Sequence, residues 1–390
     1  MNKPKALLTP KGEKWLRSGH PWIFRDDVSI LDKVENGDVT ALYNLKNIFL
    51  GWAFYSRYSR ITFRLITLEP LIIDQAFWRL TLQKAIKGRK EFLNLDQACR
   101  LVFSEADGLP GLIADWYAGH LVLQSLIPGI ERLLNQLGEL FQELLNPKSI
   151  LIRNDLEARS LEHLIQEVRT FSGQIPEKVL IQEGLIQYWV DLLSGQKTGA
   201  YLDQRENRLY LALCAQSQGR VLDCFCYTGG FALHLARKAN EVWAIEDSAK
   251  ALEWGKLNAE LNGVSNITFQ KKNVFELLKE VEEQGRRFDL IVLDPPPFAR
   301  KKSAVSGALR GYQEINRRAL KCLNPGGILS TYSCSYNITE PLFLDILAQS
   351  ARKAGNRVYL LEKRMQARDH PILLNFPESY YLKGLNVQVT

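Results

Sequence analysis

The sequence predicts an α/β protein of several domains, in which a parallel sheet with helices on both faces forms the carboxyl-terminal part. The chain has 390 residues, more than the roughly 250–300 at which single hydrophobic cores stop growing. Short alternating segments fill residues 1–70, and from about residue 181 short apolar strands alternate with amphipathic helical stretches. The second pattern is typical of βαβ units.

The first 72 residues have the pattern of a small β-barrel-like domain. Residues 39–43 and 61–65 alternate apolar and polar side chains, as strands with one buried face do. The tripeptide Asn-Gly-Asp at 36–38 supplies turn residues before the first of these segments. We therefore expect short strands joined by tight turns in this part of the chain.

The next segment, residues 73–180, predicts a mixed α+β domain. Apolar side chains recur at helical spacing over 74–93 and 131–145. Strand-like segments at 101–103 and 121–125 flank a turn-rich stretch between these two helices. Helices and strands thus alternate here without the regular βαβ order of the remaining chain.

The third domain, residues 181–390, contains five short apolar strands in the pattern of a parallel sheet. In such folds, ligands bind beyond the carboxyl ends of the strands. The candidate acids and the candidate nucleophile described below each follow one of these strand ends. The predicted strands are residues 221–223, 242–245, 267–269, 290–293 and 327–332.

The composition is that of a folded protein inside the cell, with 46% hydrophobic and 24% charged residues. No stretch reaches the roughly 20 consecutive apolar residues that a membrane-spanning helix needs. The amino terminus lacks the apolar core of a secretory signal. We therefore expect a cytoplasmic protein without a membrane partner. The six cysteines show no paired spacing of the kind that zinc sites use, so we expect no metal.

The positive charge indicates a polyanionic partner, since the net charge is +7. Residues 1–70 contain 11 Lys and Arg against 7 Asp and Glu. A second basic segment, residues 300–318, contains a single acid, Glu314. Charge runs are usually solvated faces, so the location of these segments relative to the site is decisive. The basic residues of the second segment are Arg300, Lys301, Lys302, Arg310, Arg317 and Arg318.

A glycine loop follows the first strand of the third domain and predicts a cofactor site. Residues 224–230 read Cys-Phe-Cys-Tyr-Thr-Gly-Gly, and glycines between a strand and a helix let a ligand approach the backbone closely. The spacing G-x-G-x-x-G of dinucleotide enzymes is absent. Glu246 follows the next strand, 23 residues after Asp223, where an acid that accepts hydrogen bonds from ribose hydroxyls is expected. The third strand leads to Asn273, a polar side chain that could reach an adenine edge.

The fourth strand ends in Asp294, which three prolines and Phe298 follow. Proline fixes φ and removes amide donors. A rigid loop of this kind presents carbonyl acceptors and one carboxylate to a planar polar substrate. The alternative is a plain turn that ends the strand.

The fifth strand leads to Cys334, a thiol placed beside the cofactor for covalent chemistry. Carbon 5 of cytosine is not nucleophilic enough to accept a methyl group directly. Attack of a thiolate on carbon 6 activates carbon 5, and an acid near ring nitrogen 3, such as Asp294, would stabilise the adduct. A structural cysteine is the alternative at this position.

Together these motifs resemble one family, the RlmI-like rRNA methyltransferases, over essentially the whole chain and in the same order. The resemblance implies an amino-terminal PUA domain, which is a small RNA-binding β-barrel, at residues 1–72. It implies a middle α+β domain at 73–180 and a class I Rossmann-like methyltransferase domain at 181–390. The matching strings are GHPWIF (19–24), EADGLPGLI (105–113), GQKTGAYLDQRENR (195–208), YTGGF (227–231), LDPPPF (293–298), ALRGY (308–312), SCS (333–335) and FPESYYLKGL (376–385).

The resemblance also implies the cofactor S-adenosylmethionine and roles for individual residues. Glu246 would hold the ribose and Asn273 would lie by the adenine. Cys334 matches the family's nucleophile, and Asp294 would be the second catalytic residue. The residues expected to bind the cofactor are Gln204, Arg205, Asp223, Phe225, Tyr227, Gly229, Glu246, Ser248, Asn273, Val274, Asp294 and Pro295.

Two positions depart from the pattern of the family and its wider class. Asn273 stands where an Asp is usual. Pro297 stands where other RNA cytosine methyltransferases carry a second Cys that helps to release the adduct. Another base must therefore serve that step here.

Characterised relatives of this type make 5-methylcytidine in large-subunit rRNA, and they suggest a homodimer. Phosphate contacts in the two basic segments would position the RNA without reading its sequence. The target base must leave its stack, because a paired base hides carbons 5 and 6. The residues expected to contact RNA are Lys14, Arg17, His20, Arg300, Lys301, Lys302 and Arg310.

Two other functions stay open at this point. Methylation of a guanine nitrogen needs no thiolate, and such enzymes often carry an acid-Pro-Pro-aromatic motif. Here an additional proline displaces Phe298 by one position. An RNA-binding assembly factor without turnover is the third possibility, against which the intact glycine loop, Glu246 and Cys334 argue.

Overall fold

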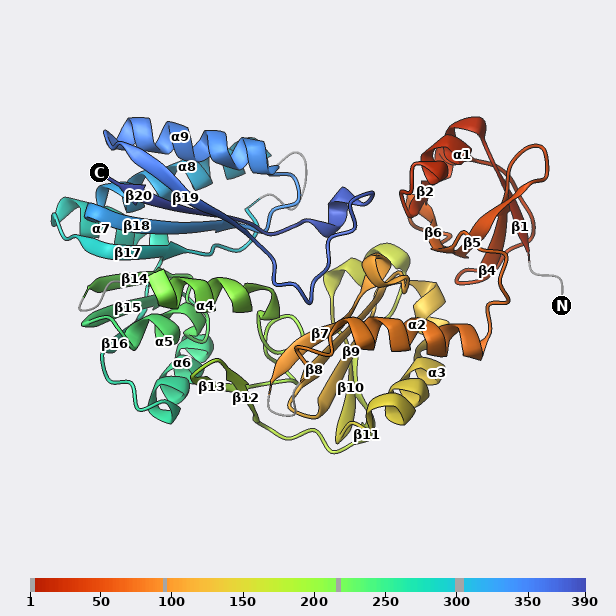
Figure 1. Ribbon diagram of the computed structural model, residues 1–390, viewed down its shortest axis with the longest axis horizontal. Helices are drawn as coiled ribbons and strands as arrows, with labels where there is room; N and C mark the ends of the chain where they lie inside the picture. Colours follow the sequence, from red (N-terminus) through yellow and green to blue (C-terminus); the bar gives the residue numbers. More distant parts are fainter. Residues whose placement is uncertain (1–3, 94–96, 215–218, 299–304) are drawn as a thin grey trace. The chain divides into compact units, whose positions relative to one another are not determined.

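The computed structural model describes residues 4–93, 97–214, 219–298 and 305–390, which belong to two compact units (Figure 1). The carboxyl-terminal part of the chain contributes to both units. The first unit comprises Met1–Ile181, Val190–Leu202 and Arg368–Ser379. The second comprises Gln182–Trp189, Asp203–Ala367 and Tyr380–Thr390.

The first unit begins with a six-stranded sheet. Its strands are β1 (Lys5–Leu8), β2 (Trp22–Phe24), β3 (Val28–Leu31), β4 (Val39–Tyr43), β5 (Phe49–Tyr55) and β6 (Ile61–Thr67). They lie in the order β2-β6-β5-β4-β1-β3, and only β1 with β4 is parallel among the pairs described. The helix α1 (Pro10–Arg17) begins at Thr9, whose side chain accepts a hydrogen bond from the Gly12 N–H. The buried side chains of Leu8, Ile23 and Phe63 form the core of this small β domain, as expected.

A second sheet of five strands follows within the same unit. Its strands are β7 (Ala98–Phe103), β8 (Leu112–Tyr117), β9 (His120–Ser125), β10 (Ser149–Asn154) and β11 (Glu167–Gly173). They lie in the order β11-β10-β9-β8-β7, with β9 and β10 parallel. The helices α2 (Gln75–Gly88) and α3 (Pro128–Leu145) pack on it through Trp78, Leu82 and Leu137. This is the α+β arrangement that the sequence predicts.

The second unit is built on a seven-stranded sheet. Its strands are β14 (Arg220–Cys224), β15 (Glu241–Glu246), β16 (Ile267–Lys271), β17 (Phe288–Leu293), β18 (Leu323–Ser333), β19 (Val358–Met365) and β20 (Lys383–Val389). They lie in the order β16-β15-β14-β17-β18-β20-β19. The first five are parallel, whereas β20 is antiparallel to both of its neighbours. A short hairpin of β12 (Val179–Glu183) and β13 (Ile186–Val190) precedes this sheet in the chain.

Helices cover both faces of the seven-stranded sheet (Figure 1). The helices are α4 (Arg205–Cys214), α5 (Gly230–Ala236), α6 (Ala249–Leu261), α7 (Val274–Glu283), α8 (Val305–Lys321) and α9 (Glu340–Ala354). Successive side chains of a strand point to opposite faces. Leu222 therefore joins the core formed with α7, α8 and α9, while its neighbour Val221 joins the core formed with α4, α5 and α6.

The five strands predicted for the third domain are confirmed as β14 to β18, so the Rossmann-like fold class is correct. The sequence analysis did not predict β19 and β20, whose pairing joins the end of the chain to β18. Within the described part of the chain, no helix combines the length and the apolar character that crossing a membrane requires.

Candidate active site

The glycine loop after β14 adopts an unusual backbone path. Phe225 and Tyr227 have positive φ values of 64° and 50°, and Gly229 follows with 84°. The left-handed region costs a non-glycine residue roughly 1–2 kcal/mol, so two such residues in one loop need support from their surroundings. The support comes from the end of β15, because the Cys226 N–H donates to the Ile245 carbonyl at 3.0 Å.

Glu246 holds the same loop through its side chain. Its Oε2 accepts from the Tyr227 N–H at 3.1 Å, and its Oε1 accepts from the N–H groups of Asp247 and Ser248 at 2.9 and 3.1 Å. Backbone donors thus fix the carboxylate at the carboxyl end of β15. A carboxylate oxygen has more than one lone pair, so Glu246 can also accept from ligand hydroxyls.

Asp223 is fully buried at the end of β14. Its Oδ2 accepts from the Ala232 N–H at 2.9 Å, whereas Oδ1 has no hydrogen-bond partner among the described residues. Burial raises the pKa of Asp223, and the nearby carboxylates of Asp294 and Glu246 raise it further. The three acids at the ends of β14, β15 and β17 therefore lie close enough to influence one another, and burial favours the neutral form of Asp223.

The adjacent strand ends bring Asp294 and Cys334 into one place. Leu293 pairs with Cys224 of β14 on one side and with Thr331 of β18 on the other. The Cys334 thiol lies 3.9 Å from the Pro295 carbonyl oxygen, as a weak hydrogen bond. The predicted nucleophile therefore contacts the Asp-Pro-Pro loop directly, in the sheet position that this class of fold uses for ligands.

Phe298, at the end of the proline loop, is turned toward the helices. Its ring lies 4.7 Å from the ring of Tyr312 on α8 and 5.9 Å from that of Phe275 on α7. The ring is partly buried and packs against the hydrophobic core through these two contacts, which disfavours its use as a stacking platform for a nucleobase.

The remaining predicted cofactor residues lie in the same unit. Gln204 is buried, and its Nε2 has no hydrogen-bond partner among the described residues, so this donor suits a ligand. Arg205 begins α4, directly after it. The side chains of Ser248 and Asn273 cap the helices α6 and α7. The Val274 side chain is buried in the core, so Val274 could reach a ligand only through its backbone. These cofactor contacts stay predictions.

The amino-terminal RNA-contact residues differ in exposure. Lys14 and Arg17 are exposed on α1, where Arg17 pairs with Glu13 at 2.9 Å. His20 is buried, bonds to Glu378 at 3.2 Å and lies 5.5 Å from the ring of Phe376. The burial of its ring in the first unit argues against the expectation that His20 contacts RNA, which stays a prediction.

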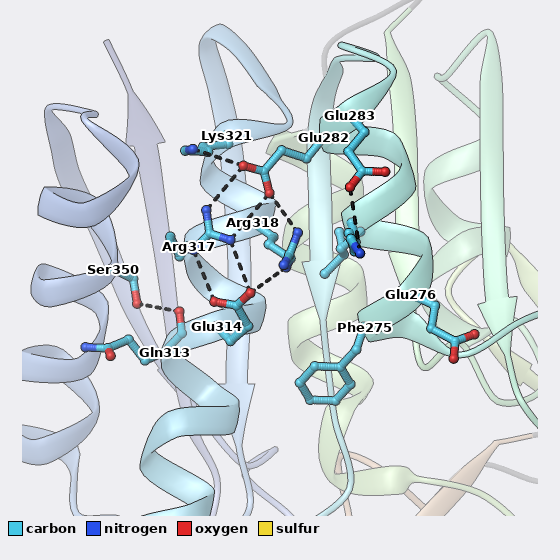
Figure 2. A network of polar contacts seen from close by, with 12 residues as sticks. Phe275, Glu276, Glu282, Glu283, Gln313, Glu314, Arg317, Arg318, Lys321 and Ser350 are labelled. Atoms are coloured by element: carbon cyan, nitrogen blue, oxygen red, sulfur yellow. Dashed lines mark hydrogen bonds and ion pairs between the residues drawn. The ribbon is translucent and has the colours of Figure 1, made fainter.

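The second basic segment is only partly available for RNA. Figure 2 shows Arg317 and Arg318 of α8 bound to Glu282 of α7 and to Glu314. Lys321 adds a contact of 2.9 Å to Glu282, so the charge of these residues is largely balanced. Arg310, one turn inside α8, is exposed. Arg300, Lys301 and Lys302 lie outside the described residues.

Lys383, which the sequence did not single out, is buried beside the segment of Cys334. Its Nζ donates to the carbonyl oxygen of Ser335 at 2.9 Å. Lys383 belongs to the string FPESYYLKGL, but nothing in that string indicates which strand it would pair with.

Two family models match the chain. A PUA-like domain model matches residues 7–68, and an S-adenosylmethionine-dependent methyltransferase model matches residues 109–374. Among solved structures, an S-adenosylmethionine-dependent methyltransferase from Streptococcus mutans has a TM-score of 0.85 at 22% identity and covers 99% of this chain and 100% of its own. A similar structure, at 23% identity and the same TM-score, is complexed with SAH. At these identities, the likeness shows the fold.

Curated relatives extend the match to the full length. The ribosomal RNA large subunit methyltransferase I of Tolumonas auensis is 42% identical over 98% of both chains. The protein of the same name from Vibrio cholerae is 38% identical over 99% of both chains. The chain is thus an enzyme that uses S-adenosylmethionine, and it belongs to the family of the ribosomal RNA large subunit methyltransferase I proteins.

Proposed function

We propose that this enzyme methylates carbon 5 of a cytosine in large-subunit rRNA through a covalent adduct with Cys334. The observation that carries the proposal is the contact between the Cys334 thiol and the Pro295 carbonyl, at 3.9 Å and directly beside Asp294. A thiol and an acid at two neighbouring strand ends are the two groups that this chemistry requires. The names of the full-length relatives support rRNA as the substrate.

The residues of the site fit the cofactor. S-adenosylmethionine carries a positive sulfonium and an ammonium group, and the acids Asp223, Glu246 and Asp294 lie at the ends of the neighbouring strands β14, β15 and β17, close enough to interact electrostatically. Glu246 is fixed where it can accept from ribose hydroxyls, and Gln204 offers a buried donor without a partner among the described residues. When bound, the cofactor supplies an electrophilic methyl group.

The residues of the chain would carry out the remaining steps. The Cys334 thiolate would form a bond to carbon 6 of the cytosine, and the electron pair of the ring double bond would make carbon 5 nucleophilic. Asp294, as the neutral acid, would donate its proton to ring nitrogen 3, where negative charge develops, and would take the proton back when the adduct breaks down. After methyl transfer, a base would take the proton from carbon 5, the sulfur–carbon bond would break, and the thiolate would be restored.

The basic residues and the PUA-like domain support an RNA partner. Lys14, Arg17 and Arg310 are exposed and can contact phosphates. Arg300, Lys301 and Lys302 remain in the proposal on their sequence position alone. We place the reaction in the cytoplasm, where rRNA is made and modified in bacteria. A homodimer is part of the proposal as well, and light scattering of the purified enzyme tests it.

Methylation of a guanine nitrogen is the rival reaction. An enzyme of that kind would use an aromatic ring after the acid-Pro-Pro motif to stack on the base. The packing of Phe298 against Tyr312 and Phe275 argues against this use. An RNA-binding factor without turnover is disfavoured by the preserved contacts of Glu246 and the glycine loop.

The test is a methyl-transfer assay with labelled S-adenosylmethionine on unmodified large-subunit rRNA, followed by nucleoside analysis. We expect 5-methylcytidine from the intact enzyme and a loss of at least 10³-fold in rate for Cys334→Ala, the order of loss seen when a covalent nucleophile is removed. Cys214→Ala is the matched control, since it removes a partly exposed thiol at the end of α4. Label on guanosine in both the intact enzyme and Cys334→Ala would instead establish the rival reaction.

A further inference from the structure

Lys383 is a buried lysine next to the candidate nucleophile, and the proposed mechanism does not use it. It begins β20 and lies opposite Ser333, the last residue of β18, in the antiparallel register. Only 3% of its surface is exposed. Its Nζ donates to the carbonyl oxygens of Ser335 at 2.9 Å and of Tyr381 at 2.8 Å. The ammonium group therefore ties the backbone directly after Cys334 to the residues that precede β20.

The charge of this lysine is costly at such a position. Lysine is almost never fully buried unless it is paired, and a carbonyl oxygen is a neutral acceptor. Burial lowers the pKa of Lys383 to about 8, and the electrostatic interaction with Cys334 acts in the opposite direction. An ammonium has three N–H donors, of which these two hydrogen bonds account for two.

The other titratable groups described around this segment come from α8, the end of β17, β19 and α9. On α8, the Tyr312 hydroxyl bonds to the hydroxyls of Ser333 and Ser335 at 3.0 and 3.1 Å, and burial raises its pKa to about 12, so it stays neutral. Asp294 follows the end of β17, and its charge, like that of Cys334, raises the pKa of Tyr312.

Two further charged side chains of the described residues, Arg364 and Glu340, lie on the other face of the sheet or bind other partners. Gly384, the next residue of β20, lies against Tyr332 of β18 and Arg364 of β19, which are therefore on the opposite face of the sheet. Glu340 of α9 binds Lys363 of β19 and the Tyr380 hydroxyl.

We propose that Lys383 is a positioning residue for Cys334, which stabilises the thiolate form of the nucleophile and fixes the backbone of its loop. The inference rests on the proposed function, in which Cys334 attacks the base. With a pKa of about 8, Lys383 is mainly an ammonium ion near neutral pH, so the thiol proton leaves to water and the thiolate remains beside the ammonium. The third N–H of that ammonium is then the donor for the sulfur, while the Ser335 and Tyr381 carbonyls keep the amine in place.

The test is the pH dependence of Cys334 alkylation by iodoacetamide in the full-length enzyme, followed for the Cys334 peptide by mass spectrometry. An ordinary cysteine titrates near pH 8.5, and only the thiolate reacts. We expect the wild-type midpoint below that value. Lys383→Met should move the midpoint up by about one pH unit, which lowers the rate at pH 7 about tenfold. Lys383→Arg, which keeps the charge, should restore a low midpoint.

Lys363→Met is the matched control, because Lys363 of neighbouring β19 is half-exposed and binds Glu340 instead. It should leave the midpoint unchanged. A Lys383→Met protein that binds S-adenosylmethionine with wild-type affinity and keeps the wild-type midpoint would overturn the inference. If this variant does not fold, the wild-type profile decides, since a midpoint at or above about 8.5 contradicts a stabilised thiolate.

The outcome is separable from that of the proposed function. Full methylation by Cys334→Ala would defeat the covalent mechanism, whatever the alkylation profile shows. If methylation depends on Cys334 but the alkylation midpoint is the same in Lys383→Met as in the wild type, only the proposed role of Lys383 is refuted.

Discussion

At the scale of single residues, Glu246 connects the cofactor loop to the sheet. Its carboxylate accepts three backbone N–H groups, including that of Tyr227, whose left-handed backbone needs support. Hydrogen bonds to a charged acceptor contribute roughly 1.5–3 kcal/mol each, more than neutral ones. The residue therefore shapes the loop, in addition to its proposed role in holding the ribose of the cofactor.

We expect Glu246→Gln to weaken S-adenosylmethionine binding about ten- to hundredfold, as isothermal titration calorimetry would measure. Both carboxylate oxygens of Glu246 accept hydrogen bonds from backbone N–H groups. In Gln an NH₂ group replaces one of these oxygens, so one backbone N–H would face another donor. Glu253→Gln, an exposed acid on α6, is the control and should bind normally. Normal binding by Glu246→Gln would show that the ribose is held elsewhere.

At the scale of elements, an ion network joins α7 and α8 on one face of the sheet (Figure 2). Burial would raise the pKa of Glu282, but hydrogen bonds from Lys321 and Arg317 outweigh it and lower the pKa. Because the pKa of Glu282 is lower in the folded than in the unfolded state, its ionised form stabilises the fold at pH values above the unfolded pKa. This stabilisation is lost as the pH falls through the folded pKa. The network thus supports α8, the helix that also carries Tyr312 and Arg310.

The expected effect of Glu282→Gln is a loss of about 1 kcal/mol in the free energy of unfolding at pH 7, since partly exposed pairs contribute little each. The difference from the wild type should shrink as the pH falls below about 4.3, the usual pKa of an unfolded Glu, and should vanish below the lowered folded pKa of Glu282. Urea unfolding at pH 7 and pH 4 measures both. Glu283→Gln is the matched control, because Glu283 has only an exposed contact with Lys279 at 3.9 Å. A pH-independent difference would exclude the charge as its cause.

At the scale of the whole molecule, the amino-terminal residues proposed to contact RNA lie in a different part of the chain from those proposed to bind the cofactor. Lys14 and Arg17 lie on α1 of the PUA-like domain, whereas the cofactor residues lie in the second unit. Phosphate contacts release counterions, so each contact steepens the dependence of affinity on salt.

The double variant Lys14→Ala/Arg17→Ala should bind rRNA more weakly and lower the slope of log K against log salt by up to about 2, because each substitution removes one cation that can neutralise a phosphate. Its affinity for S-adenosylmethionine should be unchanged. Filter binding at salt concentrations from about 50 to 200 mM measures the slope. Lys90→Ala, an exposed lysine of the same unit, serves as the control. An unchanged slope would remove α1 from the RNA-binding surface.

The contrast between His20 and Lys383 shows what local sequence cannot indicate. His20 lies in a basic segment that predicts an exposed side chain, but Glu378 and Phe376, from the other end of the chain, enclose it. Lys383 gives no local signal, because its position beside Cys334 depends on the antiparallel pairing of β20 with β18. In both cases, residues distant in sequence decide the environment.

The sequence by itself determined the βαβ succession, the glycine loop and the acids and thiol at the strand ends, because these follow from short-range periodicity and from residues adjacent to a strand. Only the three-dimensional packing decides which strand ends meet, which of the basic residues are paired, and that a buried lysine binds the backbone next to the candidate nucleophile. The physical reason is that burial and charge compensation depend on contacts across the sheet, which local patterns of polarity do not encode.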